Sequence, residues 1–241
     1  MFQSASASKA LKCYNPLMQF DILTTFPNSF SYLNESIIKR AQNKELIKIN
    51  IHDLRSWATD KHKTTDDKPF AGNPGMLMKI EPIYKALKDL EVYPNRDSKT
   101  KIILTSAKGK TWNQSMAADY SKNIERLVII CGHYEGVDHR VEEHLIDEEI
   151  SIGNYVLSGG EIPSMIMIDS ITRLISGAIG NENSLLEESH TRLQNGEDIE
   201  YPQYTRPAKF LTDEGDEWDT PEILLSGDHK AIEQWKHKIS N

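Results

Sequence analysis

Short apolar runs alternate with amphipathic stretches along the first 180 residues of the chain. Runs typical of strands occur at residues 20–26, 46–54, 101–106, 127–131 and 151–157. Apolar residues at helical spacing predict intervening helices at residues 31–44, 81–93, 110–123, 137–147 and 162–179. Because strands alternate with helices, we expect an α/β fold, with a mostly parallel sheet covered by helices on both faces.

Two other segments depart from this alternation. Residues 55–82 are polar, contain glycine and proline and show little periodicity, which indicates a long ordered loop. Residues 181–201 are acidic and predict a flexible linker. The C-terminal residues 202–241 include an amphipathic run near their end, so we expect a small helical domain there, after a main domain at residues 18–180.

The first residues, the cysteines and the hydropathy bear on where the protein works. Residues 1–17 lack the apolar run of a secretory signal, and we expect a disordered leader or a start assigned too early, with Met18 as the true first residue. No run approaches the roughly 18 apolar residues of a membrane span. Cys13 and Cys131 offer no disulfide framework or zinc site. We therefore expect a cytoplasmic protein with no membrane association.

The charge balance argues against general nucleic-acid binding. The formal net charge is −8 at pH 7 and the sequence pI is about 5.5, whereas a basic balance is usual for such binders. Local basic stretches remain at Lys39–Arg40 and at residues 60–63. Each of these, taken alone, is most simply a solvated charged surface.

Motifs of several common enzyme classes are missing from the sequence. It contains no GxGxxG opening a helix after the first strand, no GxxxxGK[ST], no GxSxG and no HExxH, which excludes the usual dehydrogenases, Rossmann methyltransferases, P-loop proteins, α/β-hydrolases and zincins. Instead, the glycine-bearing turns LTSAKGK, CGHYEGVD and SIGNYVLSGGE stand at three predicted strands. One glycine turn is usually only a turn. Three turns at one edge of a sheet indicate a common ligand cradle.

The stretch GHYEGVDHRVEEHLIDEEISIGNYVLSGGE resembles the signature of the bacterial tRNA (guanine-N1)-methyltransferases, the TrmD family. The resemblance continues through DDKPFAGNPGMLMKIEP, YPQYTRP and ILLSGDHKAIEQW, in the family's order, over nearly all of residues 20–239. It implies a SPOUT-class fold with a deep C-terminal trefoil knot that binds S-adenosylmethionine in a bent form. It also implies tRNA as partner, dependence on magnesium and a homodimer with each active site between subunits, although no all-protein metal site is visible.

The resemblance also implies a set of cofactor-binding residues, all within or beside the three turns. They are Leu104, Thr105, Ser106, Gly132, Tyr134, Glu135, Gly136, Ile152, Gly153, Tyr155, Leu157, Gly159 and Gly160. Their chemistry fits, because Leu157 and Ile152 could flank adenine, and the Glu135 carboxylate could lie beside the cationic sulfonium and ammonium groups. Alternatively, Glu135 is only an acidic residue at a helix N-terminus.

Methylation at N1 of guanine requires loss of the proton on that nitrogen. A general base is needed, together with a donor for the negative charge that develops on O6. The resemblance implies that Arg173 is the donor, with Asp169 and Ser170 matching beside it. Alternatively, Arg173 is a surface residue of an amphipathic helix.

The general base of the family is an aspartate in the linker, followed by glycine. This chain has Asn195–Gly196 there, and an asparagine cannot accept the proton. We therefore assign the base to Asp198, with Glu197 and Glu200 as alternatives.

The resemblance implies two sets of tRNA-binding residues, in the long loop and after the linker. They are His62, Lys63, Asp66, Asp67 and Lys68, followed by Arg206 and Lys209. Phosphate contacts would supply affinity, while a flipped guanine would be recognised at its edges. The family's basic tail is missing after residue 241, so we expect its contacts to be absent or supplied elsewhere.

These inferences predict methylation of N1 of guanine 37, next to the anticodon of tRNA. Two alternatives stay open. One is a related SPOUT enzyme that modifies another RNA atom, such as a ribose 2′-oxygen. The other is a protein that binds the cofactor without catalysis, given the altered linker and the missing tail.

Overall fold

The computed structural model describes residues 17–72, 74–180 and 201–239, so most of the predicted leader and linker lie outside the described residues. The chain divides into two compact units, Met1–Gly180 and Asn181–Asn241. Each unit is described by itself below.

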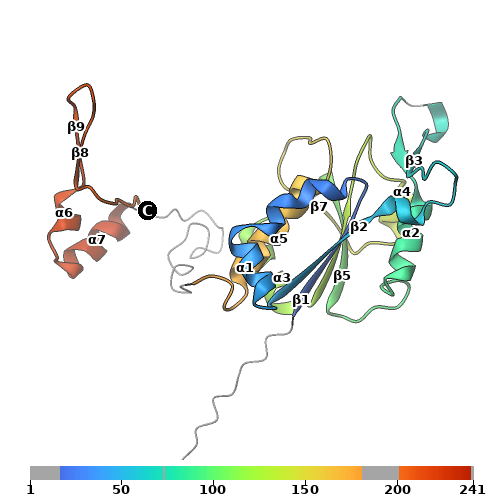
Figure 1. The fold of residues 1–241 in the computed structure, drawn as a ribbon, viewed down its shortest axis with the longest axis horizontal. Coiled ribbons are helices and arrows are strands. Elements are labelled where there is room, and N and C mark those ends of the chain that lie inside the picture. Colours follow the sequence, from blue (N-terminus) through green and yellow to red (C-terminus); the bar gives the residue numbers. More distant parts are fainter. Residues whose placement is uncertain (1–16, 73, 181–200, 240–241) are drawn as a thin grey trace, which may run out of the picture. The chain divides into compact units, whose positions relative to one another are not determined.

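A five-stranded sheet forms the centre of the first unit (Figure 1). Its strands run in the order β2-β1-β6-β5-β7, and every neighbouring pair is parallel. The strands are β1 (Met18–Thr24), β2 (Ile47–Asp53), β5 (Thr100–Thr111), β6 (Arg126–Cys131) and β7 (Glu148–Ser151). The prediction of an α/β fold with a mostly parallel sheet is confirmed.

Two hydrophobic cores lie on opposite faces of this sheet. Strand β6 contributes to both, because alternate side chains of a strand point to opposite faces. Leu127 and Ile129 pack in the first core, and Val128 and Ile130 in the second. The helices at the first core are α1 (Ser36–Asn43), α3 (Gln114–Asn123) and α5 (Glu161–Leu174), and those at the second are α2 (Ile80–Asp89) and α4 (His139–His144).

The helix predicted over residues 31–44 is in fact two helices. A 3₁₀ helix, η1 (Pro27–Asn34), begins with a proline, and α1 starts after an extended Glu35. Phe30 and Leu33 are buried three residues apart, the spacing at which 3₁₀ side chains align. The apolar pattern therefore marked the buried face correctly but could not show the break.

The long loop at residues 55–82 has short elements of its own. They are η2 (Leu54–Trp57), β3 (Asp66–Asp67), η3 (Phe70–Gly72) and β4 (Leu77–Met78). Strands β3 and β4 pair antiparallel, and the segment projects beyond α2 and α4 in Figure 1. We call the described residues from 58 to 79 the arm.

The predicted ends of two strands were wrong. Strand β5 continues through the predicted turn LTSAKGK to Thr111, because after a shift of register Lys110 and Thr111 pair again with β7. Strand β7 ends at Ser151, so residues 152–157 form a loop rather than the predicted strand. Val156 in that loop is 84% exposed. Its apolar character therefore does not reflect burial in a strand.

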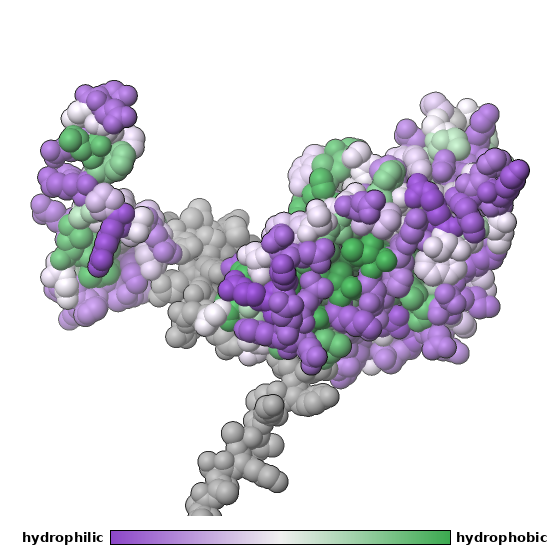
Figure 2. Space-filling model, in the orientation of Figure 1, coloured by the Kyte–Doolittle hydropathy of each residue, from purple (hydrophilic) through white to green (hydrophobic). Residues whose placement is uncertain are grey.

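The second unit contains a hairpin that the sequence analysis did not predict. Strands β8 (Lys209–Leu211) and β9 (Glu217–Asp219) pair antiparallel, and the helices α6 (Glu222–Leu225) and α7 (His229–Ile239) follow. No described residue of this unit is fully buried. Phe210 and Trp218 are about half exposed or more, and Figure 2 shows hydrophobic surface on the hairpin.

A buried carboxylate links three strands of the main sheet. Asp21 on β1 is 1% exposed and accepts hydrogen bonds from Arg126 Nε on β6 at 2.8 Å and Asn50 Nδ2 on β2 at 2.8 Å. His52 Nε2 lies 2.9 Å from the same carboxylate, and Gln19 Nε2 also donates to it. Burial alone would raise the pKa of Asp21, but these hydrogen bonds outweigh it and hold that pKa well below its usual range.

Replacing Asp21 with Asn should lower the free energy of unfolding by about 3 kcal/mol, because it breaks a buried ion pair and leaves Arg126 uncompensated. The pKa of Asp21 is lower in the folded protein than in the unfolded chain, where it is near 3.8. The stabilisation is therefore fully present above pH 3.8 and is lost as the pH falls from there toward the pKa of the folded state. Urea denaturation at pH 7 and at several values below pH 4 measures both effects. Exposed Glu91 is the control, since Glu91→Gln should leave stability unchanged; an equal loss in both variants would refute the role of Asp21.

Candidate functional site

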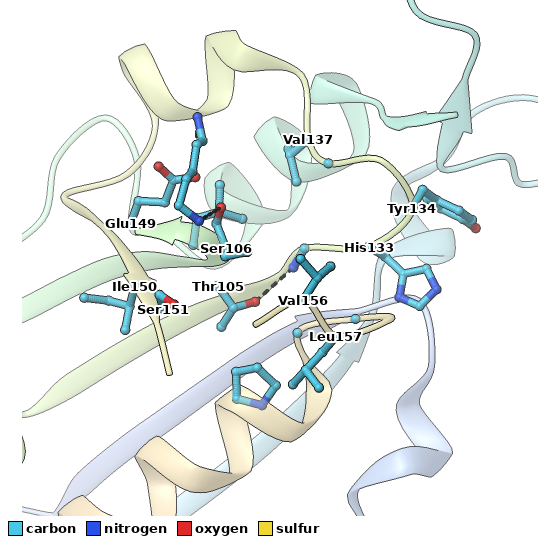
Figure 3. Close-up of a pocket in the computed structure, with 18 of the residues that line it drawn as sticks. Thr105, Ser106, His133, Tyr134, Val137, Glu149, Ile150, Ser151, Val156 and Leu157 are labelled. Atoms are coloured by element: carbon cyan, nitrogen blue, oxygen red, sulfur yellow. Dashed lines mark hydrogen bonds and ion pairs between the residues drawn. The ribbon is translucent and has the colours of Figure 1, made fainter. Parts of the chain in front are cut away.

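A cavity of about 430 Å³ lies at the carboxyl ends of β5, β6 and β7 (Figure 3). This volume is within the usual range of small-ligand pockets, about 300–1,000 Å³. The wall consists mainly of β5, the segments that follow β6 and β7, and the start of α5, at residues 104–108, 132–139, 149–152, 155–160 and 163. The cavity therefore lies where ligands bind in open parallel sheets, beyond the carboxyl ends of the strands.

All the predicted cofactor-binding residues except Gly153 line this one cavity. They are Leu104, Thr105, Ser106, Gly132, Tyr134, Glu135, Gly136, Ile152, Tyr155, Leu157, Gly159 and Gly160. Gly153 does not line the cavity and has a φ of +153°. A Cβ there would lie 2.5 Å from the ring of Tyr155, so this glycine allows Tyr155 to fold back over the loop.

Strand β5 and the two turns that carry Gly132 and Gly160 approach one another closely around Thr105. The Gly132 N–H donates to Thr105 Oγ1 at 3.0 Å, a bond marked at Thr105 in Figure 3. The Gly160 N–H donates to the Gly132 carbonyl at 2.7 Å. A Cβ on Gly160 would lie 1.9 Å from Thr105 Oγ1, and one on Gly132 would lie 2.5 Å from the Thr105 carbonyl oxygen. These contacts leave no room for a side chain at either glycine.

The cavity wall combines an apolar slot with acidic groups. Val137, Ile150, Val156 and Leu157 line it, and Figure 3 shows them around the same space. Figure 2 shows hydrophobic surface over the loop that follows β7. Such a slot suits a planar aromatic group, with backbone N–H and C=O groups available at its edge.

Acidic side chains outnumber lysines and arginines in the wall. Lys108 Nζ lies 2.5 Å from Glu142 Oε2 and 3.6 Å from Glu149 Oε1, and the Glu142 hydrogen bond raises the pKa of Lys108. Glu135 and Asp138 also line the cavity. The local balance is therefore negative, which favours a cationic ligand.

Arg173 does not line this cavity. It is in the last turn of α5 and lines a second groove of about 420 Å³, together with Tyr32, Ile162, Met165, Ile166, Asp169 and Ser170. Tyr32 OH donates to Asp169 Oδ2 at 2.5 Å, and this hydrogen bond raises the pKa of Tyr32. The candidate bases Asp198, Glu197 and Glu200 lie outside the described residues.

The predicted tRNA-binding residues fall into the two units. His62, Lys63, Asp66, Asp67 and Lys68 belong to the arm. Arg206 and Lys209 belong to the second unit, where Lys209 Nζ lies 3.3 Å from Glu217 Oε2. Neither set lines the cavity.

Comparison with known proteins identifies the family. The family model for tRNA (Guanine-1)-methyltransferase TrmD matches residues 18–241. The chain belongs to the TrmD family. Similar relatives include proteins of Staphylococcus carnosus, 47% identical over 92% of this chain and 85% of the relative, and of Ruminiclostridium cellulolyticum, 47% identical over 92% and 91%. A Clostridioides difficile protein is 46% identical over 92% of both chains. All three carry the name tRNA (guanine-N(1)-)-methyltransferase, which confirms the resemblance.

Sequence reasoning missed two residues that support the TrmD cavity from behind. Glu161, at the start of α5, is 7% exposed and accepts a hydrogen bond from Thr24 Oγ1 at 2.8 Å. Its other oxygen, Oε2, lies 3.8 Å from His133 Nδ1, and His133 lines the cavity. The acid directly after the two glycines of LSGGE was the available signal, but only the fold brings it to the end of β1.

Metal and membrane features are absent from the part of the chain that the structure describes. No group of three or more His, Cys, Asp or Glu residues is placed to hold a metal ion there, so magnesium dependence stays a prediction. None of the described helices has the length and apolar character needed to cross a membrane.

Replacing Gly160 with Ala should destabilise the first unit by about 1–3 kcal/mol, because the added methyl group overlaps Thr105 Oγ1. The same variant should bind the predicted cofactor, S-adenosylmethionine, at least tenfold more weakly, since the turns around the cavity must separate. Thermal denaturation and calorimetric titration measure the two effects.

A control and a double variant make this prediction specific. A Cβ added to Gly180 would have no atom within 4 Å, so Gly180→Ala should change neither stability nor binding. Removing the overlapping oxygen as well, in a Gly160→Ala, Thr105→Ala protein, should destabilise by less than the sum of the two single changes. Strict additivity would show that the overlap with Thr105 is not the cause.

Proposed function

We propose that this protein transfers a methyl group from S-adenosylmethionine to N1 of guanine 37 in tRNA. The glycine-walled cavity carries the proposal, because it is formed by the residues that match the cofactor turns of the family. The relatives' printed name supports the N1 position of guanine as the target.

The residues around the cavity fit S-adenosylmethionine. The slot of Val137, Ile150 and Leu157 would hold the adenine, and the acidic wall, with Glu135, would attract the cationic groups. The close approach of Gly132 and Gly160 would expose backbone N–H and C=O groups to the ligand. When bound, the cofactor supplies an electrophilic methyl group on its sulfonium.

The proton chemistry is assigned to an acid of the linker and to Arg173. Asp198 would accept the proton from N1 of the guanine, with Glu197 and Glu200 as substitutes. The Arg173 guanidinium would hold the negative charge that develops on O6. Since positive charge beside O6 also makes the N1 proton more acidic, these two residues would assist each other.

The position of Arg173 supports an active site formed by two subunits. A helix rises about 1.5 Å per residue, so α5 carries Arg173 roughly 18 Å along its axis from Glu161, which lies behind the cavity. That separation is too large for an arginine side chain to cover. In a homodimer, Arg173 of one subunit could serve the cavity of the other. The half-exposed Ile162 and Ile166 give α5 an apolar face for such a contact.

Two features of the fold complete the proposal. A trefoil knot is supported by the passage of Gly159 and Gly160 directly beside Gly132, His133 and Thr105, as expected where a chain threads past itself. A tRNA-binding role for residues 202–241 is supported by the exposed aromatic residues of the hairpin, which offer stacking surfaces. The linker at residues 181–201 would carry the base between the two.

A single-turnover assay with a defined, unmodified tRNA tests the function. The parent protein should place one methyl group on N1 of guanine 37, located by mass spectrometry, and none on a transcript with adenine 37. Asp198→Ala should slow the reaction by about 10²–10⁴-fold and Arg173→Ala by about 10²–10³-fold, with cofactor binding retained. Exposed Arg40 on α1 is the control, since Arg40→Ala should keep the parent rate.

Other results of this assay would identify the alternatives. A methyl group on a ribose 2′-oxygen would indicate a different SPOUT activity. Cofactor binding without any transfer would indicate a non-catalytic protein. Full turnover by Asp198→Ala would reassign the base, and Glu197→Ala and Glu200→Ala would then identify it.

Mixing two inactive variants tests the shared active site. Val156 is exposed at the cavity, so Val156→Arg should block the cofactor while keeping the fold, and Arg173→Ala removes the charge donor. When equal amounts are mixed and the subunits exchange, half of the dimers become heterodimers, and each heterodimer has one intact site. The mixture should therefore recover about a quarter of the parent activity. No restoration, despite heterodimers seen by native mass spectrometry, would place Arg173 and the cavity of one chain in the same site.

A further inference from the structure

Phe70 is the most exposed large hydrophobic residue of the described chain, at 94%. It begins η3 in the arm, where Ala71 has a φ of +70° and Gly72 a φ of +74°. A non-glycine residue in this left-handed region is strained. The exposed Phe70 ring takes no part in the two hydrophobic cores.

The base of the arm is attached to the cofactor cavity. The Met78 N–H donates to the Gly136 carbonyl at 2.9 Å, and the Glu135 N–H donates to the Met76 carbonyl at 3.1 Å. A Cβ on Gly75 would lie 2.3 Å from Glu135 Cγ, so the arm also packs tightly on that side chain. The turn that carries Phe70 is therefore held at a defined place relative to the cavity wall.

Positive charge accompanies Phe70 on the arm, although the whole chain has a net charge of −8. Lys61 and Lys68 are exposed, and no acidic side chain of the described residues pairs with either. The nearby acids are engaged by the backbone. Asp60 accepts from the His62 and Thr64 N–H groups, and Asp67 from the Lys68 N–H. The arm thus presents an exposed aromatic ring together with two exposed lysines.

This combination distinguishes Phe70 from an ordinary exposed apolar residue. Single exposed hydrophobic side chains are common on protein surfaces and need no explanation. An exposed aromatic ring accompanied by lysines is instead typical of sites for unpaired nucleic acid, where bases stack on rings and cations contact phosphates. A purely apolar partner would not require the lysines.

We propose that Phe70 stacks on an unpaired base of the tRNA anticodon loop next to the target guanine, with Lys61 and Lys68 near the adjoining phosphates. This inference rests on the proposed function. N1 is on the base-pairing edge of guanine, and the base must leave its stack for the reaction at N1 to occur. Its neighbour then loses a stacking partner, and the Phe70 ring replaces it.

The experiment measures tRNA binding by four variants of the full chain. Phe70→Ser should weaken tRNA binding by about 5- to 150-fold, the range for losing one stacked base, with S-adenosylmethionine binding unchanged. Phe70→Leu should weaken it similarly, because it keeps apolar bulk without a flat ring. Phe70→Trp should bind within about twofold of the parent. Ile51→Ser, which removes an exposed apolar side chain from β2, is the matched control and should have no effect.

A fluorescent base reports the contact itself. The parent protein should quench 2-aminopurine placed beside the target guanine, and Phe70→Ser should not. Lys68→Ala should instead reduce the dependence of log K on log salt by about 0.7 per lost phosphate contact, while Phe70→Ser should leave that slope unchanged.

Four outcomes would overturn the inference. Phe70→Ser could bind tRNA as tightly as the parent, or Phe70→Leu could restore full binding, which would exclude stacking. A change in oligomeric state of Phe70→Ser would show that the ring faces a second copy of the chain. A parent protein that never methylates tRNA would remove the proposed function and this inference together, whereas a methylating parent matched by Phe70→Ser would remove the inference alone.

Discussion

The close backbone approach around Thr105 is the contact on which the cavity depends. Its hydroxyl accepts from the Gly132 N–H, and Gly160 passes so near that no Cβ fits between them. This contact joins the ends of β5 and β6 to the start of α5. A flexible loop could hold a ligand only after losing conformational entropy, whereas turns already packed together present their N–H and C=O groups in advance.

The contact around Thr105 fixes the start of α5, and the length of this helix separates the cavity from Arg173. The helix begins at the cavity with Glu161 and ends in the groove that contains Arg173. One chain therefore has cavity residues at the start of α5 and Arg173, the proposed charge donor, in its last turn. The separation of the cavity from Arg173 would account for the apolar groove on α5. An exposed apolar groove has no role in a single chain, but two copies of the chain could bury it at their contact. In the proposed dimer, catalysis would depend on assembly.

In the arm, as around Thr105, backbone contacts position a binding surface, here the one proposed for tRNA. Its base is hydrogen-bonded to the turn that carries Glu135, while its tip exposes Phe70 and lysines. A rigid attachment of this kind keeps the proposed RNA contact in register with the methyl donor. Affinity and chemistry are thereby placed on neighbouring elements rather than on one flexible segment, as precise positioning of two reactants requires.

The sequence by itself determined the α/β class and the order of the strands along the chain, because periodicity is a local property, and its resemblance to the TrmD family supplied many of the cavity residues. It misjudged the end of β7, since Val156 and Leu157 are apolar for a cavity and not for a strand. It also missed Glu161 and His133, which meet Thr24 and Phe26 only in the fold. Tertiary structure alone decided that Arg173 lies far from the cavity, because the direction of a helix depends on the packing at its start.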